Sequence, residues 1–186
     1  TKRRPKYLVA APMTHAAGVI ALPLMAQGST TVVLDGVDPL KIMEAIEQHG
    51  ITHLFLPPTA IYMMLDHPDI RKFDYSSLEY FIYSAAPMSA ERLKSAIDVF
   101  GPVMTQGYGQ AEVPLLCTFM SPGDHLIALT EGLHHRFESC GRPSHLMRLK
   151  VVDEAGGVAG IPEFRMIDDG FEEGEVRRDA TDAELA

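Results

Sequence analysis

The stretch Val103-Met104-Thr105-Gln106-Gly107-Tyr108-Gly109-Gln110-Ala111-Glu112 begins as an apolar β-type segment and ends in two glycines, an aromatic ring and a carboxylate. Glycines let the backbone turn sharply and approach a ligand where a Cβ atom would collide. The Tyr108 ring offers a flat face for a base, and Glu112 offers oxygens for a hard cation such as Mg2+. The pattern therefore suits a nucleoside triphosphate that carries a metal. For so short a motif, a plain turn with a buried tyrosine and a solvated glutamate is the alternative.

Segments typical of strands and helices alternate along the chain on both sides of this stretch. Apolar and β-branched runs predict strands over residues 7–11, 30–34, 51–56, 78–83 and 103–106. Apolar residues at helical spacing predict helices between them, ending near residues 27, 49, 65 and 100. Such alternation with short connections is typical of a parallel sheet covered by helices. The expected fold class is α/β, a three-layer sandwich in which helices flank a mainly parallel, flavodoxin- or Rossmann-like sheet.

Capping residues mark the ends of several predicted helices. Asp38 precedes a proline, which is favoured at the first helical position, and Gly50 is expected to close the same helix. Thr59 and Ser89 are the expected N-caps of the next two helices. The apolar stripe of the helix after Asp38 is expected to comprise Leu40, Ile42, Met43 and Ile46.

The regular order loosens after Glu112. Residues 115–119 are predicted as a further strand, 121–139 as a loop, and 146–152 as an edge strand that alternates apolar and basic residues. The pair His134-His135 makes a poor chelate because adjacent side chains diverge on helices and strands alike, so exposed loop histidines are expected.

Composition divides the chain into an α/β body over residues 1–153 and an acidic tail over 154–186, which is expected to be poorly ordered. Residues 1–152 carry 14 acidic and 13 basic side chains, whereas residues 153–186 carry 11 acidic and 3 basic ones. A nearly neutral body with an acidic tail argues against a nucleic-acid partner, which needs a basic surface.

The class of protein follows from the remaining composition. With 186 residues and 46% hydrophobic side chains, the chain is ordinary for an α/β protein with one sizeable core. No apolar run approaches the ~20 residues that span a bilayer, and the basic residues 1–6 lack the apolar stretch of a secretory signal. Cys117 and Cys140 have no metal-like spacing and are interpreted as ordinary thiols of a reducing compartment, with the cytoplasm as the default.

Three segments with chemical potential directly follow predicted strands. His15 follows the first, Ser84-Ala85-Ala86-Pro87-Met88 the fourth, and residues 107–112 the fifth. Ligands of open parallel sheets bind beyond the carboxyl ends of the strands, so these segments are expected along one edge. The fourth and fifth strands are joined by a single helix and should be neighbours, which would place a base between the small-residue turn and the Tyr108 ring.

The ordered motifs resemble those of a known enzyme superfamily. They are Pro12-x-x-His15-x-x-Gly18, Ser84-Ala85-Ala86-Pro87-Met88-Ser89-x-Glu91, Gln106-Gly107-Tyr108-Gly109-Gln110-Ala111-Glu112 and Gly141-Arg142-Pro143. In order and spacing they are similar to the adenylate-forming enzymes, and most of all to the acyl-CoA synthetase branch, over about residues 6–153. The resemblance implies a two-step ligation: ATP and a carboxylate give an acyl-adenylate and pyrophosphate, and the thiol of coenzyme A then displaces AMP.

The resemblance also implies roles for individual residues. Tyr108 would stack on adenine, with the backbone of Ala85, Ala86 and Pro87 on the other side of the base. Glu112 would hold Mg2+ and His15 would lie at the mouth of the acyl pocket, which makes these two the expected catalytic residues. The remaining expected nucleotide-binding positions are Ser84, Gly107, Gly109, Gln110 and Ala111. ATP or AMP, Mg2+ and coenzyme A are the implied cofactors, and the acyl-CoA synthetase branch implies a carboxylic acid of the fatty type as the substrate.

Departures from the family pattern limit what the chain is expected to do alone. Ala111 stands where the family usually has threonine, so one hydrogen bond to the α-phosphate, worth about 0.5–1.5 kcal/mol, would be lost. The sequence holds no Gly/Ser/Thr-rich loop ending in Pro-Lys, no Thr-Gly-Asp and no lid with an adenylation lysine. We therefore expect the central subdomain of a longer synthetase, inactive in isolation, whose partners include the missing segments of the parent enzyme and a second copy bound through exposed faces.

Other interpretations remain open from the sequence. The same fold could serve as a non-catalytic nucleotide- or acyl-binding module, which the missing machinery and Ala111 favour. Within the superfamily, an aryl-CoA ligase or a peptide-synthetase adenylation domain differs only in the lining of the acyl pocket. An unrelated flavodoxin-like domain would bind another phosphate ligand in the same crevice, but the His15 and Gly141-Arg142-Pro143 matches argue against it.

Overall fold

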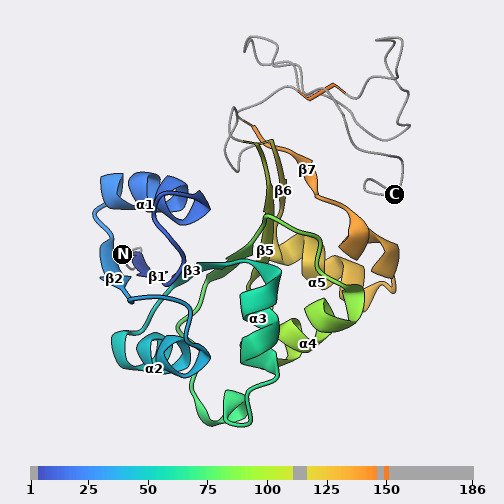
Figure 1. Ribbon diagram of the computed structural model, residues 1–186. Helices are drawn as coiled ribbons and strands as arrows, with labels where there is room; N and C mark the ends of the chain where they lie inside the picture. Colours follow the sequence, from blue (N-terminus) through green and yellow to red (C-terminus); the bar gives the residue numbers. More distant parts are fainter. Residues whose placement is uncertain (1–3, 111–116, 146–148, 151–186) are drawn as a thin grey trace.

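One mixed sheet forms the centre of the structure, a computed structural model that describes residues 4–110, 117–145 and 149–150 (Figure 1). Its strands follow the order β2-β1-β3-β4-β5-β6-β7. The first five pair in parallel, and β6 and β7 continue the sheet in antiparallel fashion. The strand bounds are β1 (Lys6–Val9), β2 (Thr30–Val33), β3 (His53–Leu56), β4 (Tyr80–Tyr83), β5 (Met104–Tyr108), β6 (Thr118–Met120) and β7 (Arg142–Pro143). The predicted α/β class with a mainly parallel sheet is confirmed.

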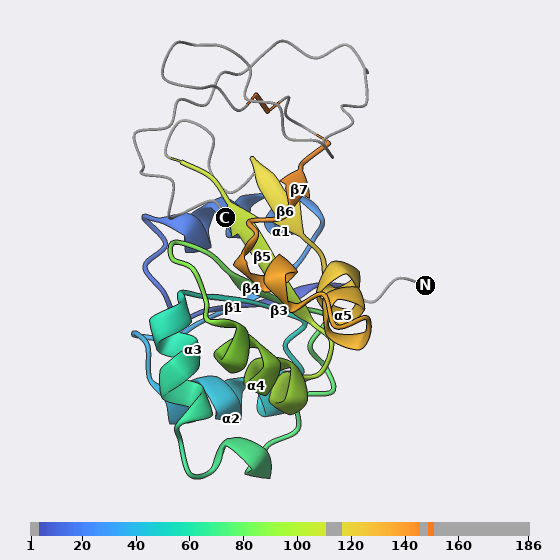
Figure 2. The same cartoon turned by 90° about the vertical axis from the view of Figure 1, so that its right-hand side faces the viewer.

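Helices connect the parallel strands and flank the sheet. They are α1 (Ala16–Ala26), α2 (Pro39–His49), α3 (Pro58–Leu65), α4 (Ala90–Phe100) and α5 (Pro122–Thr130), with short 3-10 turns η1 (Ile70–Lys72) and η2 (His134–Glu138). Figure 1 shows α1 above the sheet and α2, α3 and α4 below it, and the turned view of Figure 2 shows the same separation. None of the described helices is long and apolar enough to cross a bilayer.

The two faces of the sheet bury very different amounts of apolar side chain. The face toward α2, α3 and α4 carries the larger core cluster, which includes Ile42, Leu54, Phe81, Leu93 and Met104. The face toward α1 carries a smaller cluster of Tyr7, Val9, Ala17, Ala21, Leu24 and Phe55. Alternation along each strand assigns successive side chains to opposite faces, so the apolar runs of the parallel strands serve both clusters.

Most of the predicted helix ends are confirmed. The Asp38 carboxylate accepts a hydrogen bond from the Lys41 backbone N–H at 3.2 Å, and Gly50 closes α2 in the left-handed conformation. Ser89 Oγ accepts from the backbone N–H of Arg92 at 3.3 Å at the start of α4.

Two expectations about these helices are wrong. Thr59 does not cap α3: the cap position is Pro57, without a side-chain cap bond, because Pro58 already occupies the first helical turn and favours an extended residue before it. Leu40 does not lie in the core but is 38% exposed, and Ala45 joins the buried stripe of α2 instead.

The predicted loop over residues 121–139 is also wrong, since α5 and η2 lie there. Ser121 Oγ accepts from the Asp124 backbone N–H at 3.1 Å, and the Asp124 carboxylate accepts from the Ser121 N–H at 3.0 Å. This reciprocal capping box, with Pro122 at the first helical position, starts the helix. The predicted strand over 115–119 is found at 118–120. The predicted edge strand over 146–152 and the tail over 154–186 lie mostly or wholly outside the described residues.

Candidate functional site

The carboxyl ends of the parallel strands bring the candidate segments to one edge of the sheet. β4 and β5 are direct neighbours, and Tyr83 pairs with Gln106 near their ends. The turn after β4 and the glycine-flanked Tyr108 therefore start from adjacent positions, as the sequence predicted. His15 follows β1 on the same edge, but β3 lies between β1 and β4.

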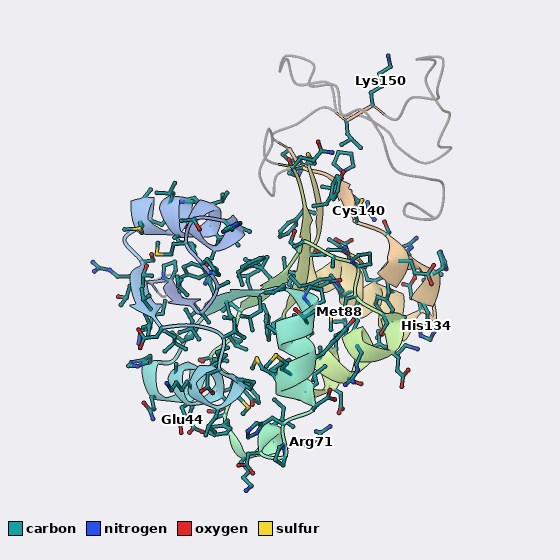
Figure 3. All side chains as sticks on the ribbon, viewed as in Figure 1. Glu44, Arg71, Met88, His134, Cys140 and Lys150 are labelled. Carbon is teal, nitrogen blue, oxygen red and sulfur yellow. The ribbon has the colours of Figure 1, made fainter. Side chains whose placement is uncertain are left out.

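The turn after β4 is anchored at both ends and open in the middle. Ser84 and Met88 are buried, and Met88 is labelled at the centre of Figure 3, whereas Ala85, Ala86 and Pro87 are exposed. Ala85 has a φ of 77°, a left-handed conformation that costs an L-residue about 1–2 kcal/mol. Strained backbone of this kind is concentrated at ligand sites, where the surrounding structure holds it in place. The exposed backbone of the turn is accessible to a flat ligand.

Tyr108 extends β5 beyond the last pair with β4. It pairs with Thr118 of β6, its ring is half-buried, and Gln110 Nε2 donates to its hydroxyl at 3.3 Å. Because side chains alternate along a strand, Tyr108 shares a face with Gln106 and projects from the sheet level with the turn after β4. Gly107, between them, is buried. The half-buried ring is therefore neither enclosed in the core nor fully exposed at this edge of the sheet.

His15 is exposed at the start of α1. Its Nδ1 lies 2.9 Å from Thr14 Oγ1, and it makes no side-chain bond to the helix backbone. Gly18 fixes the path of this loop, because a Cβ atom there would lie 2.0 Å from the carbonyl oxygen of Met13. The glycine of the Pro12-x-x-His15-x-x-Gly18 motif thus allows the helix to pack against the backbone that presents His15.

The Gly141-Arg142-Pro143 motif is joined to the site through β6. Arg142 pairs with Phe119, and Phe119 pairs in turn with Gly107 of β5. A Cβ atom at Gly141, which has a φ of 92°, would lie 2.4 Å from the Phe119 carbonyl group. A side chain at this position would therefore push β7 away from the strand that supports Gly107.

A buried polar cluster beside the two strand ends was missed from the sequence. The Tyr83 hydroxyl lies 2.9 Å from His125 Nε2 and 3.3 Å from Gln106 Oε1, and His125 Nδ1 lies 2.8 Å from the Ser121 carbonyl oxygen. Burial lowers the pKa of His125 and raises the pKa of Tyr83. The capping box Ser121-x-x-Asp124 was the sequence signal that would have placed His125 on a helix.

The described residues contain no group of three or more acidic, histidine or cysteine side chains that could hold a metal ion alone. Glu112, the predicted Mg2+ ligand, and Ala111 lie outside the described residues. A Mg2+ ion bound through one carboxylate and substrate phosphates needs no such cluster.

Two hollows of the described surface lie away from the turn after β4. One, of about 260 Å³, is lined by apolar residues of α1 together with His53, Tyr80 and Ile82 of the α1-side face of the sheet. The other, of about 370 Å³, lies at the ends of β1 and β2 and includes Pro12 and Met13. Neither includes Tyr108 or residues 84–87. In open parallel sheets, ligands bind beyond the carboxyl ends of the strands, which is where the turn after β4 and Tyr108 lie.

Comparison with known proteins gives a consistent answer. A family model described as "AMP-binding enzyme" matches residues 1–163. The chain is 38% identical over 152 residues to the medium/long-chain-fatty-acid–CoA ligase FadD8 of Mycobacterium tuberculosis, which covers 82% of this chain and 25% of that protein. It is 31% identical over 153 residues to a feruloyl-CoA synthase of an Amycolatopsis species, covering 80% of this chain and 29% of the relative.

A solved structure shares the fold. The amide bond synthetase McbA of Marinactinospora thermotolerans superposes with a TM-score of 0.77 at 28% identity, covering 87% of this chain and 32% of the other. The chain thus spans about a quarter of the length of the two curated relatives and a third of McbA.

Proposed function

The chain belongs to the family of AMP-binding enzymes, and from that premise we propose that it is the part of an acyl-CoA synthetase that binds the AMP moiety of ATP. The proposed reaction joins a carboxylate to ATP, giving an acyl-adenylate and pyrophosphate, after which the thiol of coenzyme A displaces AMP. The name of the relative with 38% identity supports a fatty acid as the substrate class.

The observation that carries the proposal is the pairing of β4 with β5. It sets the exposed backbone of Ala85, Ala86 and Pro87 beside the position of Tyr108. An adenine between them would stack on the phenol ring on one side and lie against the turn on the other. Stacking of a base on an aromatic side chain contributes about 1–3 kcal/mol.

The other roles follow from positions on the same edge. The glycines Gly107 and Gly109 let the backbone approach the phosphate, with Gln110 and Ala111 next along the loop. A Mg2+ ion held by Glu112 would supply positive charge to the phosphates as pyrophosphate leaves. His15 is assigned to the acyl side, where its exposed ring can contact the carboxylate or the incoming thiol.

Calorimetric titration with AMP tests the nucleotide site. Tyr108→Ala should weaken AMP binding about 5-fold to 100-fold, since it removes the stacking surface. Tyr80→Ala is the matched control, because Tyr80 is a partly exposed tyrosine at the opposite end of β4. Equal affinities of the two variants for AMP would contradict the assignment of Tyr108.

Activity is best tested in the longer synthetase that contains this chain. Fatty-acid-dependent release of pyrophosphate that is lost in Glu112→Ala supports the ligase. AMP binding without acid-dependent turnover would instead support a non-catalytic nucleotide-binding module of the same fold.

Aromatic acids are the second candidate substrate class, because one relative at 31% identity is a feruloyl-CoA synthase. A panel of fatty and hydroxycinnamic acids offered to the longer synthetase separates the two. A kcat/KM at least tenfold higher for the aromatic acids would replace the fatty acid as the proposed substrate.

A further inference from the structure

A chain of buried polar groups links α5 to the ends of β4 and β5. Tyr83 and His125 are each 1% exposed, so their polar atoms are bound within the protein. Tyr83 pairs with Gln106 across the two strands, and the Gln106 side chain lies against the same phenol oxygen that contacts His125. The imidazole also packs against the Tyr83 ring, with the ring centroids 5.8 Å apart.

The chemistry of the groups sets the direction of these hydrogen bonds. A carbonyl oxygen only accepts, so His125 donates from Nδ1 to Ser121, and Nε2 of the neutral ring accepts. Tyr83 has one hydroxyl proton and gives it to Nε2, the nearer of its two partners at 2.9 Å. Tyr83 Oη can then only accept from Gln106, which requires that the side-chain amide presents its NH2 group there in place of its oxygen.

These buried polar groups lie directly before the segments of the proposed nucleotide site. Tyr83 directly precedes the turn at Ser84, and Gln106 directly precedes Gly107 and Tyr108. We propose that His125 is a positioning residue that holds Tyr83 and Gln106 together and thereby fixes the spacing between the turn after β4 and the Tyr108 ring. The inference rests on the proposed function for its ligand and on this structure for its geometry.

The positioning role of His125 depends on its protonation state, which the surrounding groups influence. Burial lowers its pKa, while the Ser121 carbonyl and the Asp124 carboxylate oppose that effect. Asp124 faces Arg142 of β7, with 3.8 Å between Asp124 Oδ1 and Arg142 Nε. On the η2 side, Phe137 stacks on the His125 ring, and beyond Phe137 lies His134, whose Nδ1 is 3.2 Å from Lys94 Nζ of α4.

A second proton on His125 would reverse the order of the bonds. Nε2 would become a donor, the Tyr83 hydroxyl would turn its proton to Gln106, and the Gln106 amide would have to present its oxygen. Acidification that protonates His125 should therefore reorganise the side chain that precedes Gly107, and AMP affinity should fall with it.

AMP titration of two matched tyrosine variants tests the positioning role. Tyr83→Phe should weaken AMP binding about fivefold to tenfold, because it cuts the link between His125 and Gln106. Tyr75→Phe removes another buried phenol, one that donates to the Ile70 carbonyl at 2.7 Å far from the strand ends, and should leave AMP affinity unchanged. Equal affinities of the two variants would overturn the proposal.

Variants of His125 separate positioning from packing. His125→Gln can still accept from Tyr83 through its side-chain oxygen and does not titrate, so it should bind AMP within about twofold of the unchanged protein and lose the fall in affinity at acidic pH. His125→Leu fills similar space without an acceptor and should weaken binding as Tyr83→Phe does. A His125→Leu variant with unchanged affinity, or a His125→Gln variant with unchanged pH dependence, would contradict the role.

Failure of the unchanged protein to bind AMP would contradict the proposed function. Amide hydrogen exchange tests the positioning role of His125 separately, because it needs no ligand. Without ligand, Tyr83→Phe should speed exchange at Gly107 and Tyr108 about fivefold or more relative to Tyr75→Phe. Equal exchange in the two variants would overturn the positioning role independently of the nucleotide.

Discussion

The two faces of the sheet are built on different rules. The helices α2 and α4 each have one apolar stripe, a side chain that caps the first turn and a glycine after the last turn. α1 is apolar on nearly every side, has no side-chain cap, and contains Pro23 in its interior. Leu22 and Met25 of α1 remain exposed. One face therefore supplies stability through regular packing, whereas the α1 face tolerates irregularity next to the loop that presents His15.

The largest expected difference between the faces concerns buried phenylalanines. Phe81 is fully buried and meets the edge of Phe100 with ring centroids 4.9 Å apart, whereas Phe55 packs under α1. Phe81→Ala should lower the free energy of unfolding by about 3–5 kcal/mol. Phe55→Ala should cost less, because α1 lacks a cap bond and can move toward the space that is left. Urea denaturation measures both, and a larger loss for Phe55→Ala would reverse our view of the two faces.

A substitution at Gly18 tests how tightly the start of α1 is packed against the preceding loop. Gly18→Ala should lower stability by about 1–3 kcal/mol, because its Cβ would overlap the Met13 carbonyl oxygen. Gly36→Ala is the control, since a Cβ atom there meets nothing within 4 Å. Thermal unfolding gives the stabilities, and the NMR signals of His15 should shift only in Gly18→Ala. Similar stabilities for the two variants would mean that the loop before α1 moves freely.

The parts of the fold that could be predicted from the sequence are those whose signals lie within a few neighbouring residues. Apolar runs and capping residues predicted the parallel strands and the regular helices, because each signal is local. The neighbouring positions of residues 84–87 and Tyr108 were predictable as well, since strands joined by one helix lie side by side. The left-handed conformation of Ala85 was not, because alanine gives no local sign of it.

α5 shows that a capping signal can mark a helix, whereas the side of the helix that faces the core could not be predicted. Pro122 and Gly123 look like loop residues, yet they occupy the first turn of a helix that Ser121 caps. Leu126 and Ile127 are more than 40% exposed while His125 is buried, so the hydrophobic pattern points to the wrong side of the helix. The partner that reverses it, Tyr83, is 42 residues away in the sequence. Only tertiary contact makes that histidine an inward-facing residue.

The loss of stability at acidic pH should differ between the two faces, because their histidines are buried to different depths. Burial lowers the pKa of His125 and of the half-buried His53, which lies on the α1 face. The unfolded chain therefore binds protons more readily below about pH 6.5, and stability should fall as the pH falls, by at most about 1.4 kcal/mol per pH unit for each histidine. Denaturation midpoints measured between pH 5 and 8 test this: the midpoint should depend less on pH in His125→Gln than in His53→Gln. Identical pH profiles for the two variants would show that depth of burial does not set the effect.

Helix caps give the smallest expected difference and the most local one. Ser89→Ala should lower the free energy of unfolding by about 1 kcal/mol, because Ser89 Oγ accepts from the Arg92 N–H at the start of α4. His15→Ala at the start of α1 and Thr59→Ala in α3 should each change it by less than about 0.5 kcal/mol, since neither side chain caps its helix. Chemical denaturation of the three variants measures this. A loss at His15 equal to that at Ser89 would mean that α1 is stabilised at its first turn after all, and that the irregular face of the sheet is held by the same local rules as the regular one.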